Sequence, residues 1–266
     1  MRIASLSPAI TETLVSLGLE DEIVGVTPWC KMYLNDVSKK IVGTYRSILF
    51  DRLKEVKPDV VFLQSRVHDK MVDAVRSEGF NTHLVPLPTN IYSIISHIIL
   101  DVGAMVNRYY EARELGERLL SRILKISEKT ASVRRLRVYV EYLWPDKTFS
   151  SAGVFTFIDD GVRVAGGENI FRDTPEEFFN PSNEEIVRRN PEVILVNIEP
   201  PLEKLTPDEY KRIRKPLENT KAFRENKVIL VKESKNVNLA HFGPSFIDTV
   251  EWLTQEFEKI RSQSCS

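Results

Sequence analysis

Aromatic, basic and histidine side chains follow several segments of the sequence that are expected to be β-strands. The carboxyl ends of parallel strands meet at one edge of a sheet, and open α/β sheets bind ligands there. A rigid aromatic face suits a large planar or apolar ligand, and arginine suits the acidic groups of a ligand. The residues that we expect to contact such a ligand are Trp29, Tyr45, Arg46, Arg66, Trp144 and His241. The alternative is that the aromatic residues simply fill the ends of the fold.

No pattern in the sequence indicates catalysis or a bound metal ion. The four histidines are far apart, and none forms an H-x-x-x-H or H-E-x-x-H motif. Acidic residues are abundant, but no pair stands out as an acid–base couple. Cys30 is expected to be a small buried residue, and Cys265 lies in a polar tail, so a structural disulfide is not expected. We therefore expect a protein with no catalytic residues, no metal site and no intrinsic cofactor.

The first half of the chain alternates strands with helices. Ser7 is expected to cap a helix that begins at Pro8 and ends at Gly18. Such alternation is typical of a mainly parallel sheet with helices on both faces. The strands expected here are Arg2–Ser5, Ile23–Thr27, Lys40–Val42, Asp59–Leu63 and Thr82–Pro86.

The second half of the chain repeats this scheme, which predicts a second α/β lobe. Its expected strands include Leu136–Tyr142, Val193–Val196 and Lys227–Val231. The two halves also share a local pattern: Leu53–Val61 and Ile186–Ile194 both read as the end of a helix, a proline, an acid and a buried strand. Two similar lobes would place equivalent strand ends on either side of a cleft.

A long helical stretch, roughly Ile91 to Val133, separates the two halves. Its apolar residues recur in steps of three and four, and Asn107-Arg108 is expected to divide it into two helices. The predicted organisation is an N-terminal lobe over residues 1–106, a linking helix over residues 107–133 and a C-terminal lobe over residues 134–266. The predicted fold class is therefore α/β, with two Rossmann-like lobes joined by one long rigid helix.

The composition is typical of a globular protein, with neither the basic charge that binds nucleic acid nor a segment that spans a membrane. The 266 residues carry a net charge of −1 and 42% hydrophobic residues, so no large basic field is present. The sequence contains no run of 18 apolar residues, which is about the length that a membrane-spanning helix needs. No export signal is visible after Met1. We expect either a cytoplasmic protein or one from which an export segment has been removed.

Several stretches together resemble the substrate-binding proteins of vitamin B12 and iron–siderophore ABC importers, the helical-backbone class III periplasmic binding proteins. Their order and spacing carry the resemblance, which covers essentially the whole chain. The matching stretches are Arg2–Ala9 with Thr11 and Glu12, Val24–Thr27, Val42-Gly43, Leu53, Lys57–Val61 and Ala165–Phe171.

The resemblance implies two α/β lobes that hold a ligand in a groove between them. It also implies an exposed acid on each lobe that docks onto arginines of a membrane permease with its ATPase. These acids fall on Asp51, where glutamate is usual in the family, and on Glu184. The alternative is that both are ordinary acids in the first turn of a helix, where the helix dipole favours them. The family's aromatic ligand contacts match Trp29 and Tyr45 best.

The function expected from these observations is capture of a corrinoid or a ferric chelate for an ABC importer. A corrinoid is preferred because the strand ends are aromatic and lack the arginine cluster that a strongly anionic siderophore would need. The alternative is a cytoplasmic protein, either an enzyme or a binding protein, that handles a corrinoid or metal–tetrapyrrole without a transport role. The expected location is outside the cytoplasmic membrane if a signal was removed, and the cytoplasm if Met1 is the native start.

Overall fold

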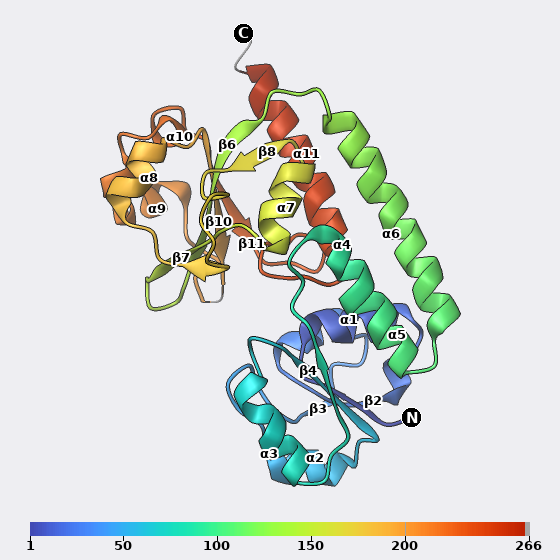
Figure 1. The fold of residues 1–266 in the computed structure, drawn as a ribbon. Helices are drawn as coiled ribbons and strands as arrows, with labels where there is room; N and C mark the ends of the chain where they lie inside the picture. Colours follow the sequence, from blue (N-terminus) through green and yellow to red (C-terminus); the bar gives the residue numbers. More distant parts are fainter. Residues whose placement is uncertain (200, 264–266) are drawn as a thin grey trace. The chain divides into compact units, whose positions relative to one another are not determined.

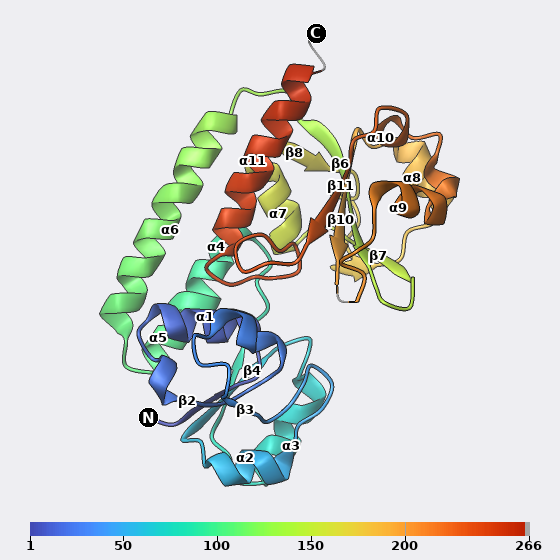
Figure 2. The ribbon, with the colours of Figure 1, turned by 180° about the vertical axis from the view of Figure 1, so that it is seen from behind.

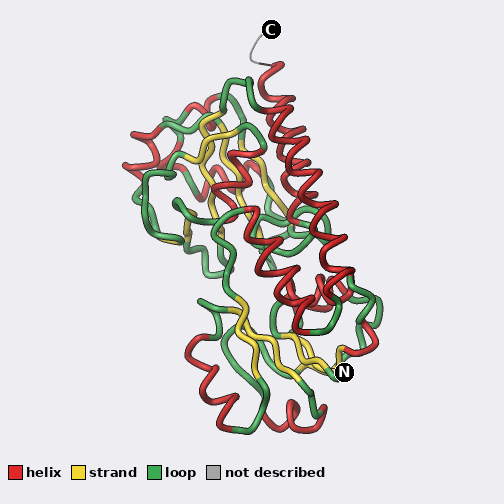
Figure 3. Tube along the Cα trace, turned by 45° about the vertical axis from the view of Figure 1, so that its right-hand side comes forward, coloured by secondary structure: helices red, strands yellow, loops and turns green. Residues whose placement is uncertain are grey.

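The computed structural model describes residues 1–199 and 201–263. Cys265 lies outside these residues. The chain forms two compact α/β units (Figure 1). Unit 1 comprises residues 1–88, 92–121 and 241–244, and unit 2 comprises residues 89–91, 122–240 and 245–266. In each unit the strands form a layer flanked by helices (Figure 3).

Unit 1 contains a five-stranded parallel sheet of order β3-β2-β1-β4-β5. Its central strands are apolar and fully buried, as expected for strands with helices on both faces. The expected strands are confirmed to within one residue at most ends. They are β1 (Ile3–Ser5), β2 (Ile23–Val26), β3 (Lys40–Ile41), β4 (Val60–Gln64) and β5 (Thr82–Val85).

The helices of unit 1 connect these strands. They are α1 (Pro8–Ser16), α2 (Phe50–Val56) and α3 (Val72–Ser77), with short 3-10 turns at η1 (Glu20–Glu22), η2 (Trp29–Tyr33) and η3 (Asp69–Met71). Helix α1 begins at Pro8, as predicted, but Ser7 makes no capping hydrogen bond with its side chain. Its hydroxyl instead donates to Gln64 Oε1 at 3.4 Å. The prediction of a Ser7 side-chain cap is therefore wrong, because a buried partner on β4 takes the hydroxyl.

Unit 2 contains a six-stranded mixed sheet in which β11, β10, β6 and β8 run parallel. The pairs β6–β7 and β7–β9 are antiparallel. The strands are β6 (Leu136–Leu143), β7 (Phe149–Ala152), β8 (Gly167–Asn169), β9 (Phe178–Phe179), β10 (Val193–Ile198) and β11 (Val228–Lys232).

Helices cover both faces of the unit 2 sheet. Helices α7 (Phe157–Val164) and α11 (Phe246–Gln263) lie on one face (Figure 2). Helices α8 (Asn183–Arg189), α9 (Pro207–Ile213) and α10 (Lys221–Arg224), with the turn η5 (Lys215–Leu217), lie on the other. The core on this second face includes Tyr139, Ile194, Tyr210 and Leu217.

The predicted helical stretch is present, but part of it is not a regular α-helix. It comprises α4 (Ile91–Ser93), a π-helical segment η4 (Ile94–Asp101), α5 (Val102–Met105) and α6 (Tyr109–Thr130). The break falls at Asn107, which has φ 57°, so the division expected there is confirmed. Helix α6 runs without interruption from unit 1 into unit 2, and the predicted fold class is confirmed.

The repeated pattern of helix, proline and strand is also confirmed. Helix α2 ends at Lys57 and α8 ends at Asn190, and both end residues adopt the left-handed conformation. A proline follows each of them, and a buried parallel strand begins two residues later. The two units therefore use the same local motif, a left-handed residue followed by proline, to connect a helix to a buried strand.

Candidate ligand-binding site

Two of the predicted aromatic residues lie together at the carboxyl edge of the unit 1 sheet. Strands β2 and β3 are parallel neighbours, with Val26 opposite Ile41, so the loops that follow them leave from the same edge. The rings of Trp29 and Tyr45 have centroids 5.1 Å apart and planes inclined by 51°. Trp29 is 43% exposed, so the pair presents an open aromatic surface rather than a buried plug.

A tight loop holds Tyr45 and Arg46 in place. Thr44 N donates to the Ser47 carbonyl at 2.8 Å, and Arg46 N donates to Thr44 Oγ1 at 3.1 Å. A Cβ atom on Gly43 would lie 2.8 Å from the Ser47 carbonyl oxygen, so only glycine allows this close approach. The Arg46 side chain is exposed beside Tyr45, where it could meet an acidic group of a ligand.

The loop that carries Arg66 is fixed by buried polar groups at the end of β4. Strand β1 lies between β2 and β4, so the point where the strand order reverses falls beside this loop. Gln64 Nε2 donates to the Val85 carbonyl at 2.9 Å, and Gln64 N donates to His68 Nδ1 at 3.0 Å. Burial lowers the pKa of His68, which keeps its ring neutral and able to accept that bond. Arg66 is exposed at this edge and has φ 68°.

His241 lies inside unit 1 and already has partners there. Its side chain is 5% exposed, and its Nε2 lies 2.6 Å from Glu12 Oε2 of helix α1. Its ring stacks on Tyr33 with a centroid distance of 4.3 Å. The sequence indicated neither partner, because Glu12 is 229 residues away.

Trp144 lies at the carboxyl edge of the unit 2 sheet. It is half-buried, stacks near Tyr142 at 6.2 Å and donates from Nε1 to Ser150 Oγ at 3.0 Å. Phe178 of β9 meets the Tyr142 ring edge-on at 6.0 Å and is 45% exposed. Phe178 was missed from the sequence, because β9 has only two residues and joins the sheet through β7.

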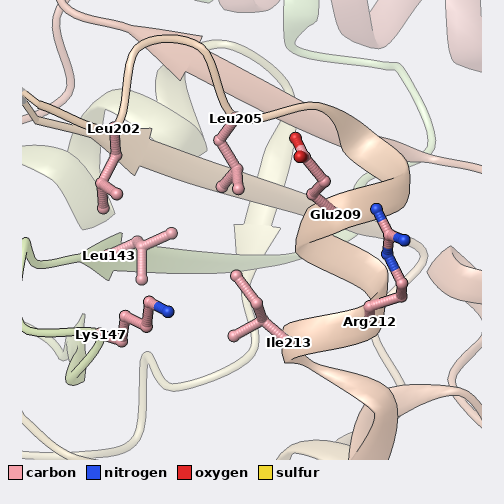
Figure 4. Close-up of a pocket in the computed structure, with 7 residues that line it drawn as sticks. All are labelled: Leu143, Lys147, Leu202, Leu205, Glu209, Arg212 and Ile213. Atoms are coloured by element: carbon pink, nitrogen blue, oxygen red, sulfur yellow. The ribbon is translucent and has the colours of Figure 1, made fainter.

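A separate cavity of about 320 Å³ lies on the other face of the unit 2 sheet (Figure 4). Glu209 at its edge is already bonded to Thr206 in the capping box of α9. None of the predicted site residues lines this cavity. Its lining residues are Leu143, Lys147, Leu202, Leu205, Glu209, Arg212 and Ile213.

The two predicted docking acids occupy equivalent positions in the two units. Asp51 lies in the first turn of α2, and Glu184 lies in the first turn of α8. Both side chains are exposed, and no ion pair to either acid is found in residues 1–199 and 201–263.

Three other features of the described residues bear on function. No group of three His, Cys, Asp or Glu side chains in this part of the chain is arranged to hold a metal ion. No helix in the same residues has the length and apolar composition that a membrane span requires. Cys30 is buried, as predicted, and burial raises the pKa of its thiol.

Comparison with known proteins identifies the family. Residues 3–234 match the periplasmic binding protein family. The chain belongs to this family. The predicted resemblance is confirmed, and the members that it matches are substrate-binding proteins rather than enzymes.

The vitamin B12-binding proteins of Yersinia pestis (strain Pestoides F) and Yersinia pseudotuberculosis (serotype O:1b, strain IP 31758) are similar to this chain. Each is 26% identical over 202 residues, which cover 74% of this chain and 69% of the relative.

Solved structures of periplasmic binding proteins share the fold. The heme-binding protein RhuT from Roseiflexus sp. RS-1 superimposes with a TM-score of 0.83 at 22% identity, covering 97% of this chain and 98% of that one. The vitamin B12-binding protein BtuF of Vibrio cholerae gives a TM-score of 0.78 at 18% identity, covering 98% of this chain and 97% of that one.

Proposed function

We propose that this protein captures a metal-centred tetrapyrrole, a corrinoid in particular, and delivers it to an ABC importer. The proposal places the protein outside the cytoplasmic membrane, as the family name indicates. Its partners would be a permease and its ATPase, and it would carry no cofactor of its own.

The observation that carries the proposal is the Trp29–Tyr45 pair. Two aromatic rings 5.1 Å apart and inclined by 51° at a strand-end edge offer a partly exposed apolar surface of the kind that a macrocycle can contact. Trp144 and Phe178 give the strand-end edge of unit 2 a similar character. Arg46 and Arg66 add two exposed cations on unit 1, which is fewer than a strongly anionic ferric siderophore would require.

The relatives support this ligand class. The relatives with 26% identity are vitamin B12-binding proteins, and the solved structures that share the fold include heme-binding and vitamin B12-binding proteins. Both ligands are large, nearly planar macrocycles with a central metal. An aromatic surface serves either of them, so the choice between them depends on the groups at the rim of the ring.

We further propose that Asp51 and Glu184 dock the protein onto permease arginines. They are exposed, they occupy matching helices in the repeated pattern, and carboxylate–arginine pairs orient transient contacts well.

Titration of the purified protein tests the proposed ligand class. Tryptophan fluorescence would be followed during addition of cyanocobalamin, dicyanocobinamide, hemin and a ferric siderophore. Saturable binding of a tetrapyrrole is expected. Binding of the siderophore alone would redirect the proposal to iron uptake, and saturable binding of none of the four would remove it.

A further inference from the structure

Three neighbouring parallel strands of unit 2 end in a row of side chains on one face of the sheet. In the register of these strands, Tyr142 of β6 lies opposite Asn197 of β10, and Asn197 lies opposite Val231 of β11. Side chains alternate between faces, so residues two positions further along each strand share their face. Those residues, each the first after its strand, are Trp144, Glu199 and Glu233. We call Trp144, Asn197, Glu199 and Glu233 the acidic row.

Contacts among these side chains agree with this placement. Trp144 stacks near Tyr142 with ring planes inclined by 22°. Asn197 Nδ2 donates to Glu233 Oε1 at 3.2 Å. Burial, and then the charges of Glu199 and Glu233, raise the pKa of Tyr142. An aromatic surface thus adjoins two carboxylates.

A buried acceptor in the acidic row lacks a donor. Asn197 is 1% exposed, and its Oδ1 has no hydrogen-bond partner among residues 1–199 and 201–263. A buried amide oxygen without a partner costs free energy, and native proteins seldom leave one unsatisfied. The missing group is a hydrogen-bond donor.

The surroundings of Glu199 also favour a ligand that donates hydrogen bonds. Glu199 is half-buried, and burial raises the pKa of its carboxyl group. No lysine, arginine or histidine in the described part of the chain forms an ion pair with it. Glu199 therefore offers a carboxylate acceptor and negative charge beside the aromatic face of this edge.

We propose that the acidic row selects a ligand whose rim carries carboxamide N–H donors and disfavours one whose rim carries carboxylates. This inference rests on the proposed function and narrows its substrate class. A corrinoid ring bears carboxamide arms, which can donate to Glu199, Glu233 and Asn197 Oδ1. A haem bears propionates, which the two glutamates would repel.

A matched pair of corrinoids tests the proposal. Dicyanocobinamide carries amide arms, whereas dicyanocobyrinic acid presents carboxylates on the same ring. Dissociation constants would be measured by calorimetry at neutral pH for the wild type, for Glu199→Gln/Glu233→Gln, and for a control, Glu128→Gln/Glu218→Gln. The control removes the same charge from two exposed glutamates of unit 2 that lie outside the acidic row.

The wild type is expected to favour the amide over the acid by at least about tenfold, and the Glu199→Gln/Glu233→Gln variant is expected to lose most of this preference. The control variant should keep it. Equal affinity for the two corrinoids in the wild type, or the same preference in both variants, would overturn the inference. Neither result would contradict the proposed binding of a tetrapyrrole. Binding of hemin with no corrinoid bound would also overturn the inference, whereas binding of none of these ligands would remove the proposed function itself.

Discussion

His241 Nε2 lies 2.6 Å from Glu12 Oε2, although the two residues are 229 positions apart in the chain. The pair is enclosed, because His241 also stacks on Tyr33 and Gly243 packs against both members. Residues 241–244 belong to unit 1, whereas the residues on either side of them belong to unit 2. This hydrogen bond therefore links residues 241–244, which belong to unit 1, to helix α1 of the same unit.

A methyl group at position 243 should disrupt this pair. A Cβ on Gly243 would overlap Glu12 Oε2 and His241 Nε2, so we expect Gly243→Ala to lower the free energy of unfolding by about 1–3 kcal/mol. Thermal or urea unfolding of the variant measures this effect. In a Glu12→Ala background the alanine should cost less, because one of the overlapping groups is gone. Full additivity of the two substitutions would contradict this explanation.

Lys57→Asn should stabilise the protein. Lys57 ends helix α2 with φ 43° and ψ 63°, a left-handed conformation that costs most residues about 1–2 kcal/mol and asparagine less. Asn190 has nearly the same angles, φ 47° and ψ 70°, and also precedes a proline. We expect a gain of about 0.5–1 kcal/mol in unfolding experiments.

The reverse substitution provides the control for this prediction. Asn190→Lys should destabilise, since it adds the backbone cost and removes the acceptor of the Lys221 N–H at 2.8 Å. A loss of stability in Lys57→Asn would show that the backbone conformation is not the controlling factor.

Protonation of Glu192 should lower the stability of the protein at acid pH. Burial would raise its pKa, but hydrogen bonds from Lys221, Arg134 and the Arg137 N–H prevail and lower the pKa to about 2. An unfolded glutamate titrates near 4.5. The stabilisation is therefore complete above pH 4.5 and is lost as the pH falls toward 2.

Glu192→Gln measures this contribution. At pH 7 the variant should unfold more easily by about 1–3 kcal/mol, because Lys221 and Arg134 lose their charged partner. Its stability should also fall less steeply than that of the wild type between about pH 4.5 and pH 3. Glu218→Gln, a change of an exposed glutamate, should follow the wild type. Parallel pH profiles for Glu192→Gln and the wild type would contradict the assignment.

Much of the fold was predictable because local rules and parallel topology agree. Strands β4 and β10 are buried on both faces, and each therefore begins with a continuous hydrophobic run, Val60–Leu63 and Val193–Val196. The π-helical segment Ile94–Asp101 was not predictable, because its apolar residues also fit α-helical spacing.

The candidate site was predictable only in part. The contact between Trp29 and Tyr45 follows from two parallel strands that share an edge. Glu199 and Glu233 were missed, since a carboxylate in a polar loop has no significance until the register places it beside Tyr142. The partnership of His241 with Glu12 depends on the chain returning to unit 1, which no local pattern encodes.

Charge reversal at Asp51 and Glu184 tests the proposed docking contacts. The double variant Asp51→Lys/Glu184→Lys should abolish permease-coupled uptake while ligand affinity changes by less than about threefold, because rim charges act mainly on the encounter. Uptake would be followed in cells or proteoliposomes that contain the permease.

A control with the same charge change is available in the same two units. Asp73→Lys/Asp208→Lys alters one exposed first-turn acid in each unit, on α3 and α9, and should support normal uptake. Equal loss of uptake in both double variants, or loss of ligand binding in the first, would count against docking through Asp51 and Glu184.

The most direct test of the proposed ligand site is the affinity of Trp29→Ala for a corrinoid. Calorimetry with dicyanocobinamide would compare this variant with the wild type and with Tyr110→Ala, which removes a ring that is 80% exposed on α6. Loss of the aromatic surface at Trp29 should weaken binding by at least about tenfold, whereas Tyr110→Ala should leave it unchanged. The same dissociation constant for the wild type and Trp29→Ala would contradict a ligand site at the carboxyl edge of the unit 1 sheet.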